Sequence, residues 1–348
     1  MKPGYTVVSH KSVYSLVARL TRAIANIAVG CLLIVSASVN AEIIESGFVN
    51  IGGIDQWVQI RGTDAGNPVL LWINGGPGGS TIPDTFAFEP WEKYFTIVMW
   101  DQRGEGKTFE KYGPTLADTM TVQRMSEDGV EVAAYLHKRL PKVRIVLLGH
   151  SWGSILGIHM IRQRPDLFAA YVGTGQVTYL PAQLEAAYPK LLERAKKLGN
   201  IEASMELINA GLPSDSNPAA YEIANKWGAQ MEPPRQPPIR PIQSPATNAR
   251  PPSYIADGVT FSSKTLDSAI TSANLPSMGV AFTVPIFFFQ GSDDLVTTTA
   301  VVRTYFEQIK APAKGFVVLE NAGHSAIFRA RDAFLDALLD RVRPLATQ

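Results

Sequence analysis

Short apolar runs alternate with amphipathic stretches along most of the chain after residue 42. Seven runs predict β-strands, and several are continuously apolar, as in strands that are buried on both faces of a sheet. They lie at residues 55–62, 68–75, 95–102, 144–151, 169–176, 285–292 and 315–322. Helical spacing of apolar positions predicts helices at 122–140, 298–309, 326–342 and directly after Ser151. This alternation predicts an α/β fold with a mostly parallel sheet and helices on both faces.

The alternation is interrupted between residues 180 and 283. Two helical patterns, at 180–199 and 201–211, follow one another with no strand between them. A proline-dense stretch at 231–252 comes next, and it holds 8 of the 24 prolines, too many for a helix or a central strand. We therefore expect residues 180–283 to form an inserted helical cap with an exposed proline-rich loop. Residues 42–179 and 284–348 would form the catalytic domain.

The first 41 residues differ in character from the remainder. They carry four basic residues and no acidic residue, and an apolar run of 17 residues spans positions 23–39. Small residues follow at Val39 and Ala41, so the segment resembles a secretory signal peptide that is removed from a periplasmic or extracellular protein. One alternative is an uncleaved membrane anchor, but the apolar run is short for a membrane span. The other is a lipid anchor at Cys31, but the apolar run continues past this cysteine and does not end before it.

Composition narrows the classes of protein that fit. Apolar residues make up 46% of the chain and charged residues 18%, as in a globular protein. The net charge of +1 argues against a nucleic-acid surface, which would need a basic excess on one face. Cys31 is the only cysteine and would leave with the signal peptide, so no disulfide, thiol nucleophile or thiolate metal ligand is expected. We predict neither a metal nor a cofactor.

The segment GHSWG at residues 149–153 matches a nucleophile elbow. In this motif a serine occupies a strained turn between a strand and a helix, which presents its hydroxyl above the sheet. The flanking glycines avoid collisions with the neighbouring strand and helix. The five-residue pattern alone is weak, but here a predicted strand precedes it and a predicted helix follows it. Ser151 is therefore the predicted nucleophile.

A serine nucleophile needs a histidine to accept its proton and a carboxylate to orient that histidine. Of the five histidines, His10 lies in the N-terminal segment, and His137 and His159 lie within helical patterns. His150 adjoins the serine, where its side chain should point away from the hydroxyl. His324, in the segment NAGHS just after the last predicted strand, remains as the predicted base.

Two neighbouring aspartates could supply the carboxylate. Asp293 and Asp294 end a buried strand, where catalytic groups of open α/β sheets collect. One of them could instead cap the next helix. We assign the catalytic role to Asp294 and keep Asp293 as the alternative. The chain order of serine, aspartate and histidine is then that of α/β-hydrolases.

A glycine-rich segment, WINGGPGGS at residues 72–80, follows another predicted strand. Its glycines allow backbone N–H groups to approach a developing oxyanion closely. We predict that the N–H groups of Gly76 and Trp152 form the oxyanion hole, with Gly75 beside them as a substrate-binding position. The segment lacks the lysine and the spacing of a phosphate-binding P-loop.

Several motifs together resemble the proline iminopeptidases and related serine aminopeptidases of the α/β-hydrolase superfamily. They are NGGPGGS, WDQRGEGKT, GHSWGS, GSDD and AGHS, and the resemblance covers residues 45–177 and 285–348. The resemblance implies the same roles that the residues themselves suggest. Ser151 would be the nucleophile, with Asp294 and His324 as its partners, and Gly76 and Trp152 would form the oxyanion hole. It also implies that Asp101 and Arg103, in DQRG, form a structural ion pair.

The sequence departs from this family at two places. Asn74 stands where the family usually has a histidine before GGPG, and the proline-rich cap is hard to match. Caps of such enzymes supply acidic residues that bind the free amino group of the substrate. The candidates for that role here are Glu185, Glu193 and Glu206, although acids at helical spacing also suit a solvated face.

Three function classes are compatible with these residues. The favoured one is an aminopeptidase, similar to proline iminopeptidases, that acts on short peptides through acyl-enzyme chemistry. The second is an esterase, lipase or amidase with the same triad, and the third is an inactive binding protein, which a complete triad disfavours. Ser151 excludes an aspartate nucleophile. The expected partner is a small molecule or short peptide, with no nucleic acid and no membrane beyond an uncleaved N-terminal segment.

Overall fold

The computed structural model describes residues 42–347 except 142–143, 215, 241 and 243–250. The predicted signal peptide, residues 1–41, lies outside these ranges and stays a prediction. Within the described ranges, none of the helices combines the length and the apolar character that crossing a bilayer requires.

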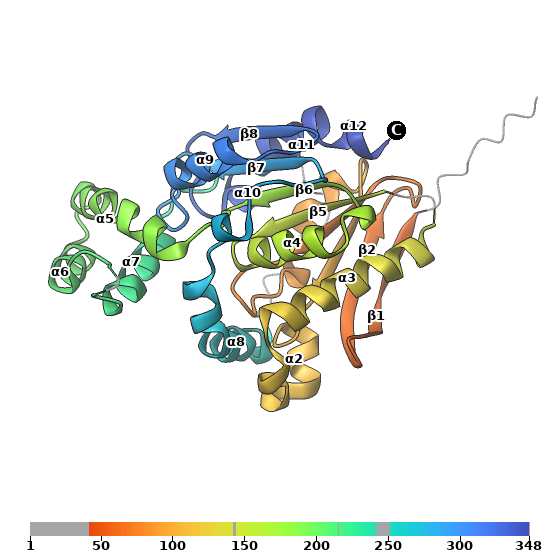
Figure 1. Ribbon diagram of the computed structural model, residues 1–348, viewed down its shortest axis with the longest axis horizontal. Coiled ribbons are helices and arrows are strands. Elements are labelled where there is room, and N and C mark those ends of the chain that lie inside the picture. The colour runs from red at the N-terminus through yellow and green to blue at the C-terminus, as the bar shows by residue number, and fades with distance from the viewer. Residues whose placement is uncertain (1–41, 142–143, 215, 241, 243–250, 348) are drawn as a thin grey trace, which may run out of the picture. The chain divides into compact units, whose positions relative to one another are not determined.

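A sheet of eight strands forms the centre of the described chain (Figure 1). The strands are β1 (Ile43–Ile51), β2 (Ile54–Gly62), β3 (Val69–Ile73), β4 (Thr96–Asp101), β5 (Ile145–His150), β6 (Phe168–Thr174), β7 (Ile286–Gly291) and β8 (Lys314–Leu319). Their order is β1-β2-β4-β3-β5-β6-β7-β8. The pairs β1–β2 and β2–β4 are antiparallel, and all other neighbours are parallel. The predicted mostly parallel sheet is confirmed.

Strand β1 was not among the predicted strands. It pairs with β2 through a two-residue turn in which Gly52 and Gly53 have φ of 58° and 77°. Two positive φ angles match the hairpin turn whose twist suits antiparallel strands. β1 lies at the edge of the sheet, and its side chains Ile44 and Phe48 are exposed. Because one face of the strand meets solvent, its hydrophobic pattern is too weak to identify it.

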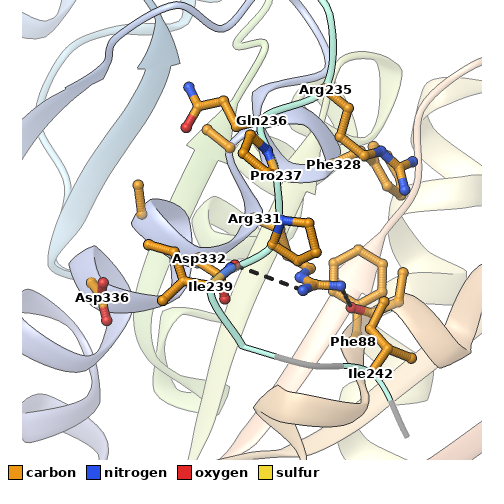
Figure 2. A pocket seen from close by; sticks show the side chains of 14 residues that line it. Phe88, Arg235, Gln236, Pro237, Ile239, Ile242, Phe328, Arg331, Asp332 and Asp336 are labelled. Carbon is orange, nitrogen blue, oxygen red and sulfur yellow. Dashed lines mark hydrogen bonds and ion pairs between the residues drawn. The ribbon is translucent and has the colours of Figure 1, made fainter. Parts of the chain in front are cut away.

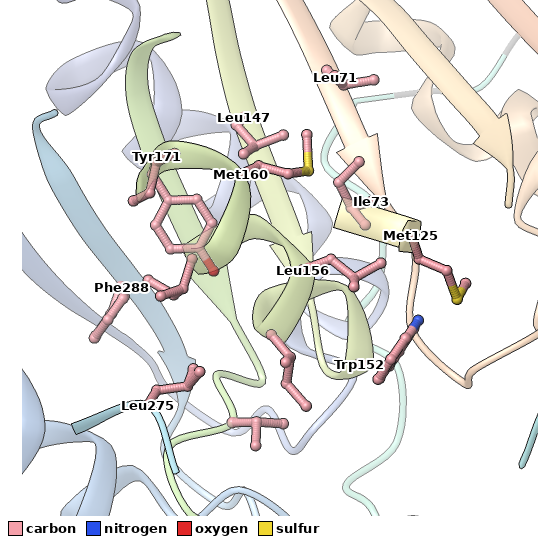
Figure 3. Packing of buried hydrophobic residues seen from close by; sticks show 14 of the residues in the cluster. Leu71, Ile73, Met125, Leu147, Trp152, Leu156, Met160, Tyr171, Leu275 and Phe288 are labelled. Carbon is pink, nitrogen blue, oxygen red and sulfur yellow. The ribbon is translucent and has the colours of Figure 1, made fainter. Parts of the chain in front are cut away.

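Helices cover both faces of the sheet and form two apolar cores. The first core lies between the sheet and α3 (Val122–Arg139), α4 (Trp152–Gln163) and α9 (Thr299–Gln308). The second lies between the sheet and η1 (Ile82–Trp91), α10 (Ala326–Arg329), α11 (Arg331–Arg341) and α12 (Arg343–Ala346). Figure 3 shows Leu156 and Met160 of α4 packed with Leu147 and Tyr171 of β5 and β6. This packing fixes the position of the turn that begins α4.

Four helices lie between β6 and β7, which confirms a helical insertion. They are α5 (Leu180–Lys197), α6 (Ile201–Ala210), α7 (Ala219–Gln230) and α8 (Ser253–Ser272). Figure 1 shows α5, α6 and α7 grouped together and α8 beside α2 (Gly106–Tyr112). The first two helices match the predicted ones, whereas α7 and α8 were not predicted. In α8 the buried positions are mainly small residues, Gly258 and Ser262 with Leu266, so its hydrophobic stripe is faint.

Candidate active site

Ser151 occupies the sharp turn between β5 and α4. Its φ of 52° lies in the left-handed region, which a residue other than glycine rarely adopts. The turn is crowded, because a Cβ atom on Gly153 would lie 2.1 Å from the Ile73 carbonyl oxygen. A Cβ atom on Gly149 would lie 2.7 Å from the carbonyl oxygen of Gly153. The two glycines are therefore required by the packing of the turn against its neighbours.

His324 and Asp294 reach the serine from two other strand ends. His324 follows β8, and its Nε2 lies 2.9 Å from Ser151 Oγ. Its Nδ1 lies 3.2 Å from Asp294 Oδ2, on the loop that follows β7. Both groups are buried, with 9% of His324 and 3% of Asp294 exposed. The fold thus joins the three predicted residues in one hydrogen-bonded chain.

The loop after β7 holds the Asp294 carboxylate in a fixed orientation. Its Oδ1 accepts hydrogen bonds from the backbone N–H groups of Val296, at 2.9 Å, and Thr297, at 2.7 Å. Its Oδ2 accepts from Thr297 Oγ1 at 2.7 Å. Asp293 faces elsewhere, accepts from Ser292 Oγ and lines separate surface cavities. The structure places Asp294, and not Asp293, against His324.

Electrostatics favour the charged carboxylate and a basic imidazole. Burial raises the pKa of Asp294, but attraction to His324 and the hydrogen bonds from His324, Thr297 and Val296 leave that pKa below its ordinary value. Burial lowers the pKa of His324, but Asp294 and then Glu232 outweigh it, so the net pKa is raised. The pair is arranged to hold an aspartate anion beside a histidine that readily accepts a proton.

Thr297 and Glu232 are two site residues that the sequence analysis missed. Thr297 Oγ1 lies 3.1 Å from His324 Nδ1 while it donates to Asp294, so it contacts both members of the pair. Glu232 belongs to the proline-rich stretch, and its Oε1 accepts from the Ser325 N–H at 2.5 Å. The sequence does contain a signal for Thr297, because it is a threonine three residues after Asp294. No local pattern in the sequence indicates Glu232.

His150 adjoins Ser151 but differs in its pKa from His324. Its Nε2 donates to the His324 carbonyl oxygen at 3.3 Å, which links the turn at Ser151 to the loop that carries His324. Burial, and then the nearby His324, lower the pKa of His150 to about 3. His150 is therefore neutral across the physiological range, and only His324 of the two can take up a proton there.

The glycine-rich loop after β3 lies next to Ser151. A Cβ atom on Gly75 would lie 3.0 Å from the Cβ atom of Ser151. Gly76 has a φ of 116°, and it lines one pocket together with Ser151 and Trp152. Trp152 is the first residue of α4, so its N–H is one of the four at the helix start that lack a partner within the helix. Gly76 and Trp152 thus both lie beside Ser151, and their role as an oxyanion hole stays a prediction.

The prediction of an ion pair between Asp101 and Arg103 is wrong. Arg103 instead pairs with Asp128 of α3, with its Nε 2.5 Å from Oδ2. Asp101 accepts a hydrogen bond from Ser80 Oγ at 2.6 Å and another from the Lys107 N–H at 2.8 Å. The two side chains therefore contact different parts of the fold. Asp101 binds the glycine-rich loop through Ser80, and Arg103 binds α3 through Asp128.

The pocket above Ser151 lies between the edge of the sheet and the cap helices α5, α7 and α8. Its apolar wall is formed by Val177, Leu180, Leu184, Ile270 and Val296. Two acidic residues also line it, Glu222 from α7 and Asp267 from α8. The pocket therefore combines an apolar wall with two carboxylates, above Ser151.

The three cap acids expected from the sequence do not line this pocket. Glu185 lines a shallow surface cavity near the start of α5, and Glu193 lines a polar cavity on the far side of Asp294. Glu206 pairs with Lys226 and also accepts from Trp227 Nε1. Glu222 and Asp267, which the sequence analysis missed, lie where those acids were expected.

A second cavity lies beneath the proline-rich stretch and away from Ser151 (Figure 2). It is lined by Phe88, Pro237, Ile239 and Phe328, with Arg331 and Asp332 at its side. Asp332 accepts a hydrogen bond from the Ile239 N–H at 2.7 Å, which fastens the stretch to α11. The cavity contains no member of the hydrogen-bonded chain at Ser151, so it is not the candidate active site.

Among the residues that the structure describes, no group of three or more histidine, cysteine, aspartate or glutamate side chains is placed to hold a metal ion.

Comparisons with known proteins bear on the family and the fold. The model of a family described as "Alpha/beta hydrolase family" matches residues 70–337. The probable aminopeptidase YbaC of Bacillus subtilis is 30% identical over 304 residues, which cover 85% of this chain and 95% of that protein. A proline iminopeptidase of Saccharolobus solfataricus is 23% identical and covers 85% and 91% respectively.

Solved structures extend the comparison to the fold. A proline iminopeptidase-related protein of Thermus thermophilus has a TM-score of 0.58 at 20% identity and covers 88% of this chain and 99% of its own. The proline iminopeptidase of Mycobacterium smegmatis has a TM-score of 0.55 at 18% identity and covers 86% and 98%. At these identities the likeness shows a shared fold. The resemblance stated from the motifs is confirmed at the level of the family.

Proposed function

Because the chain belongs to the α/β-hydrolase family, we propose that it is a serine hydrolase that releases N-terminal residues from short peptides. The observation that carries this proposal is the hydrogen-bonded chain Ser151–His324–Asp294 at the base of a pocket with two cap carboxylates. The relatives described as aminopeptidases and proline iminopeptidases support it.

The first half of the reaction acylates the serine. His324 Nε2, 2.9 Å from Ser151 Oγ, takes the hydroxyl proton as Oγ bonds to the carbonyl carbon of the substrate. The negative charge on the carbonyl oxygen faces the N–H groups of Gly76 and Trp152. The carbon–nitrogen bond then breaks, and His324 gives its proton to the departing amine. Asp294 stabilises the imidazolium and holds the tautomer that makes Nε2 the acceptor.

The second half returns the enzyme to its starting state. A water molecule attacks the acyl carbon and gives its proton to His324 Nε2, and the bond from the carbon to Ser151 Oγ breaks as that proton passes to Oγ. Thr297, which donates to Asp294 and lies beside His324 Nδ1, keeps the carboxylate aligned during both proton transfers.

The cap carboxylates suit a substrate with a free amino terminus. A cationic amine is held best by a charge-assisted hydrogen bond to a carboxylate. Glu222 and Asp267 come from different helices but line the same pocket as Ser151. The apolar wall suits a small apolar side chain such as that of proline or alanine. An esterase would have no need for the two carboxylates.

Blocking the substrate amine should weaken catalysis. We expect aminoacyl arylamides to be cleaved, and N-acetylation to lower kcat/KM by about 10-fold or more, the scale of one lost charge-assisted hydrogen bond. Glu222→Gln and Asp267→Asn should lower kcat/KM for the free-amine substrate by a similar factor, and at least one of them should remove the preference over the acetylated form. Steady-state kinetics on the paired substrates measure both effects.

Glu185→Gln is the matched control, since Glu185 is a cap acid outside the pocket. Its kinetics should equal those of the wild type. Fast turnover of short-chain p-nitrophenyl esters, with arylamides untouched whether free or acetylated, would contradict the aminopeptidase proposal and favour an esterase.

The pH dependence should reflect the raised pKa of His324. The base must be neutral to accept a proton, so activity is lost as pH falls through that pKa, which lies above the ordinary value of 6.5. The acid limb of kcat/KM should therefore have its midpoint above about 6.5. Glu232→Gln removes one of the groups that raise the pKa of His324, so the acid limb of kcat/KM for this variant should shift to lower pH. A wild-type midpoint below 6.5 would contradict this assignment.

The N-terminal pattern supports export of the protein. A basic start, an apolar run of 17 residues and the small residues Val39 and Ala41 together suit cleavage by signal peptidase after Ala41. Expression with a C-terminal tag, followed by N-terminal sequencing of the extracytoplasmic fraction, should yield a chain that begins at Glu42. An intact N-terminus in the membrane fraction would indicate an anchor instead.

A further inference from the structure

Helix α8 contacts two loops of the candidate active site with one half and lines the pocket above Ser151 with the other. Its first half packs at Gly258 and Ser262 on the loops that follow β3 and β4. Its second half brings Asp267 to the pocket wall. One helix therefore joins the packing of these loops to the place of a carboxylate that is proposed to hold the substrate amine.

Ser262 forms the polar contact between α8 and the turn after β4. Its side chain is fully buried, and its Oγ donates a hydrogen bond to the Gly104 carbonyl oxygen at 2.8 Å. Gly104 is the glycine of the DQRG motif, and a Cβ atom there would lie 2.3 Å from Ser262 Oγ. Any side chain at position 104 would therefore displace the hydroxyl that this bond requires. The glycine of the motif thus allows the turn to receive α8.

The backbone of α8 also approaches both loops closely. A Cβ atom on Gly258, one turn before Ser262, would lie 2.9 Å from the Gly104 carbonyl oxygen. A Cβ atom on Gly78 would lie 2.5 Å from the Gly258 carbonyl oxygen. Gly78 belongs to the glycine-rich loop, two residues after Gly76. We call the contacts of Gly258 and Ser262 with Gly78 and Gly104 the α8 seat. Because backbone meets backbone there, the α8 seat fixes the height of the helix above both loops.

The far end of α8 is fixed at a separate place. The N–H of Leu275, three residues after the helix, donates to the Thr178 carbonyl oxygen at 2.9 Å. Asp267 lies five residues after Ser262 and eight residues before Leu275. Because residues advance evenly along a helix, by about 1.5 Å each, a displacement at Ser262 tilts α8 about the Leu275 end. More than half of that displacement then reaches Asp267.

We infer that Ser262 is a positioning residue, which through the α8 seat places Asp267 to bind the amino group of the substrate. This role rests on the proposed function and deepens it, because it makes Asp267 the carboxylate on which the preference for a free amine depends. A charge-assisted hydrogen bond holds its donor and acceptor at about 2.7–2.9 Å, so a small displacement of the carboxylate weakens it. Glu222 lies on α7, which packs with α5 and α6, so the α8 seat does not set its position.

Kinetics on the paired substrates test this role. Ser262→Ala removes the hydrogen bond, and Gly258→Ala lifts the helix, because the new Cβ atom would lie 2.9 Å from a carbonyl oxygen. In both variants the ratio of kcat/KM for the free aminoacyl arylamide to kcat/KM for its N-acetyl form should fall by about threefold or more. A purely structural role would lower only the amount of folded enzyme, which changes both rates by the same factor and leaves the ratio unchanged. Ser268→Ala, the same change at an exposed position of α8 outside the pocket, should keep the wild-type ratio.

A combination with Asp267→Asn tests whether the α8 seat acts through that carboxylate. In this background Ser262→Ala should cause no further change in the ratio, because two changes in one interaction do not add. An unchanged ratio in both Ser262→Ala and Gly258→Ala, or an undiminished effect of Ser262→Ala in the Asp267→Asn background, would overturn the inference and leave the proposed function standing. A wild type without any preference for the free amine would overturn the proposed function, and the inference with it.

Discussion

Ser151→Ala should abolish turnover while leaving the fold intact. The hydroxyl is the only group in the hydrogen-bonded chain that can form the acyl-enzyme bond, and members of such a triad act as a unit. We expect kcat on an aminoacyl arylamide to fall by about 10⁴-fold or more. The change removes one oxygen atom from a partly exposed side chain, so little stability should be lost. Steady-state kinetics with matched thermal melts measure both quantities.

Ser154→Ala is a useful control for this variant. Ser154 lies one turn further along α4, and its hydroxyl donates to the Ser151 carbonyl oxygen at 2.6 Å. It contacts the elbow but has no part in the proposed chemistry, so its loss should cost far less activity than Ser151→Ala. Equal losses in both variants would mean that the geometry of the turn, and not the Ser151 hydroxyl, accounts for the activity.

Asp294→Asn should be the second most damaging change. An amide at this position would donate to His324 Nδ1, which stabilises the tautomer whose Nε2 carries the proton and cannot accept one from serine. Loss of the carboxylate also removes the charge that stabilises the imidazolium. Together these effects should lower kcat by about 10³- to 10⁴-fold. Asp293→Asn, the adjacent change, should stay within a few fold of the wild type.

The comparison of the two asparagine variants discriminates between the two aspartates. The ranking should hold for kcat and kcat/KM alike, because the assigned role is in the transition state. A larger loss in Asp293→Asn would reverse the assignment that the hydrogen bonds of the loop after β7 support.

The parts of the site that come from single turns could be predicted from the sequence. Ser151 lies in a local motif whose glycines are fixed by contacts with β3 and α4, so five letters and their context are enough to predict its place in a turn between a strand and a helix. His324 was found because few histidines follow a predicted strand. Asp294 was chosen over Asp293 without a decisive argument, since the sequence does not say which carboxylate the turn after β7 directs inward.

The parts that depend on packing between distant segments could not be predicted. Which acid of the cap reaches the pocket depends on how each helix rotates against its neighbours. Glu206, for example, is held at the surface by Lys226, whereas Glu222 on the next helix faces the pocket. Arg103 pairs with Asp128, which lies 25 residues further along the chain. Edge strand β1 and helix α8 were missed because only part of their surface is buried, so their hydrophobic patterns are faint.

Covalent labelling tests the central claim most directly. A fluorophosphonate probe reacts with a serine that is activated as a nucleophile, and peptide mass spectrometry locates the adduct whatever the natural substrate is. The account predicts one adduct, on Ser151, that is absent from Ser151→Ala and much slower to form in Asp294→Asn. An adduct on another residue, or labelling that persists in Ser151→Ala, would contradict it.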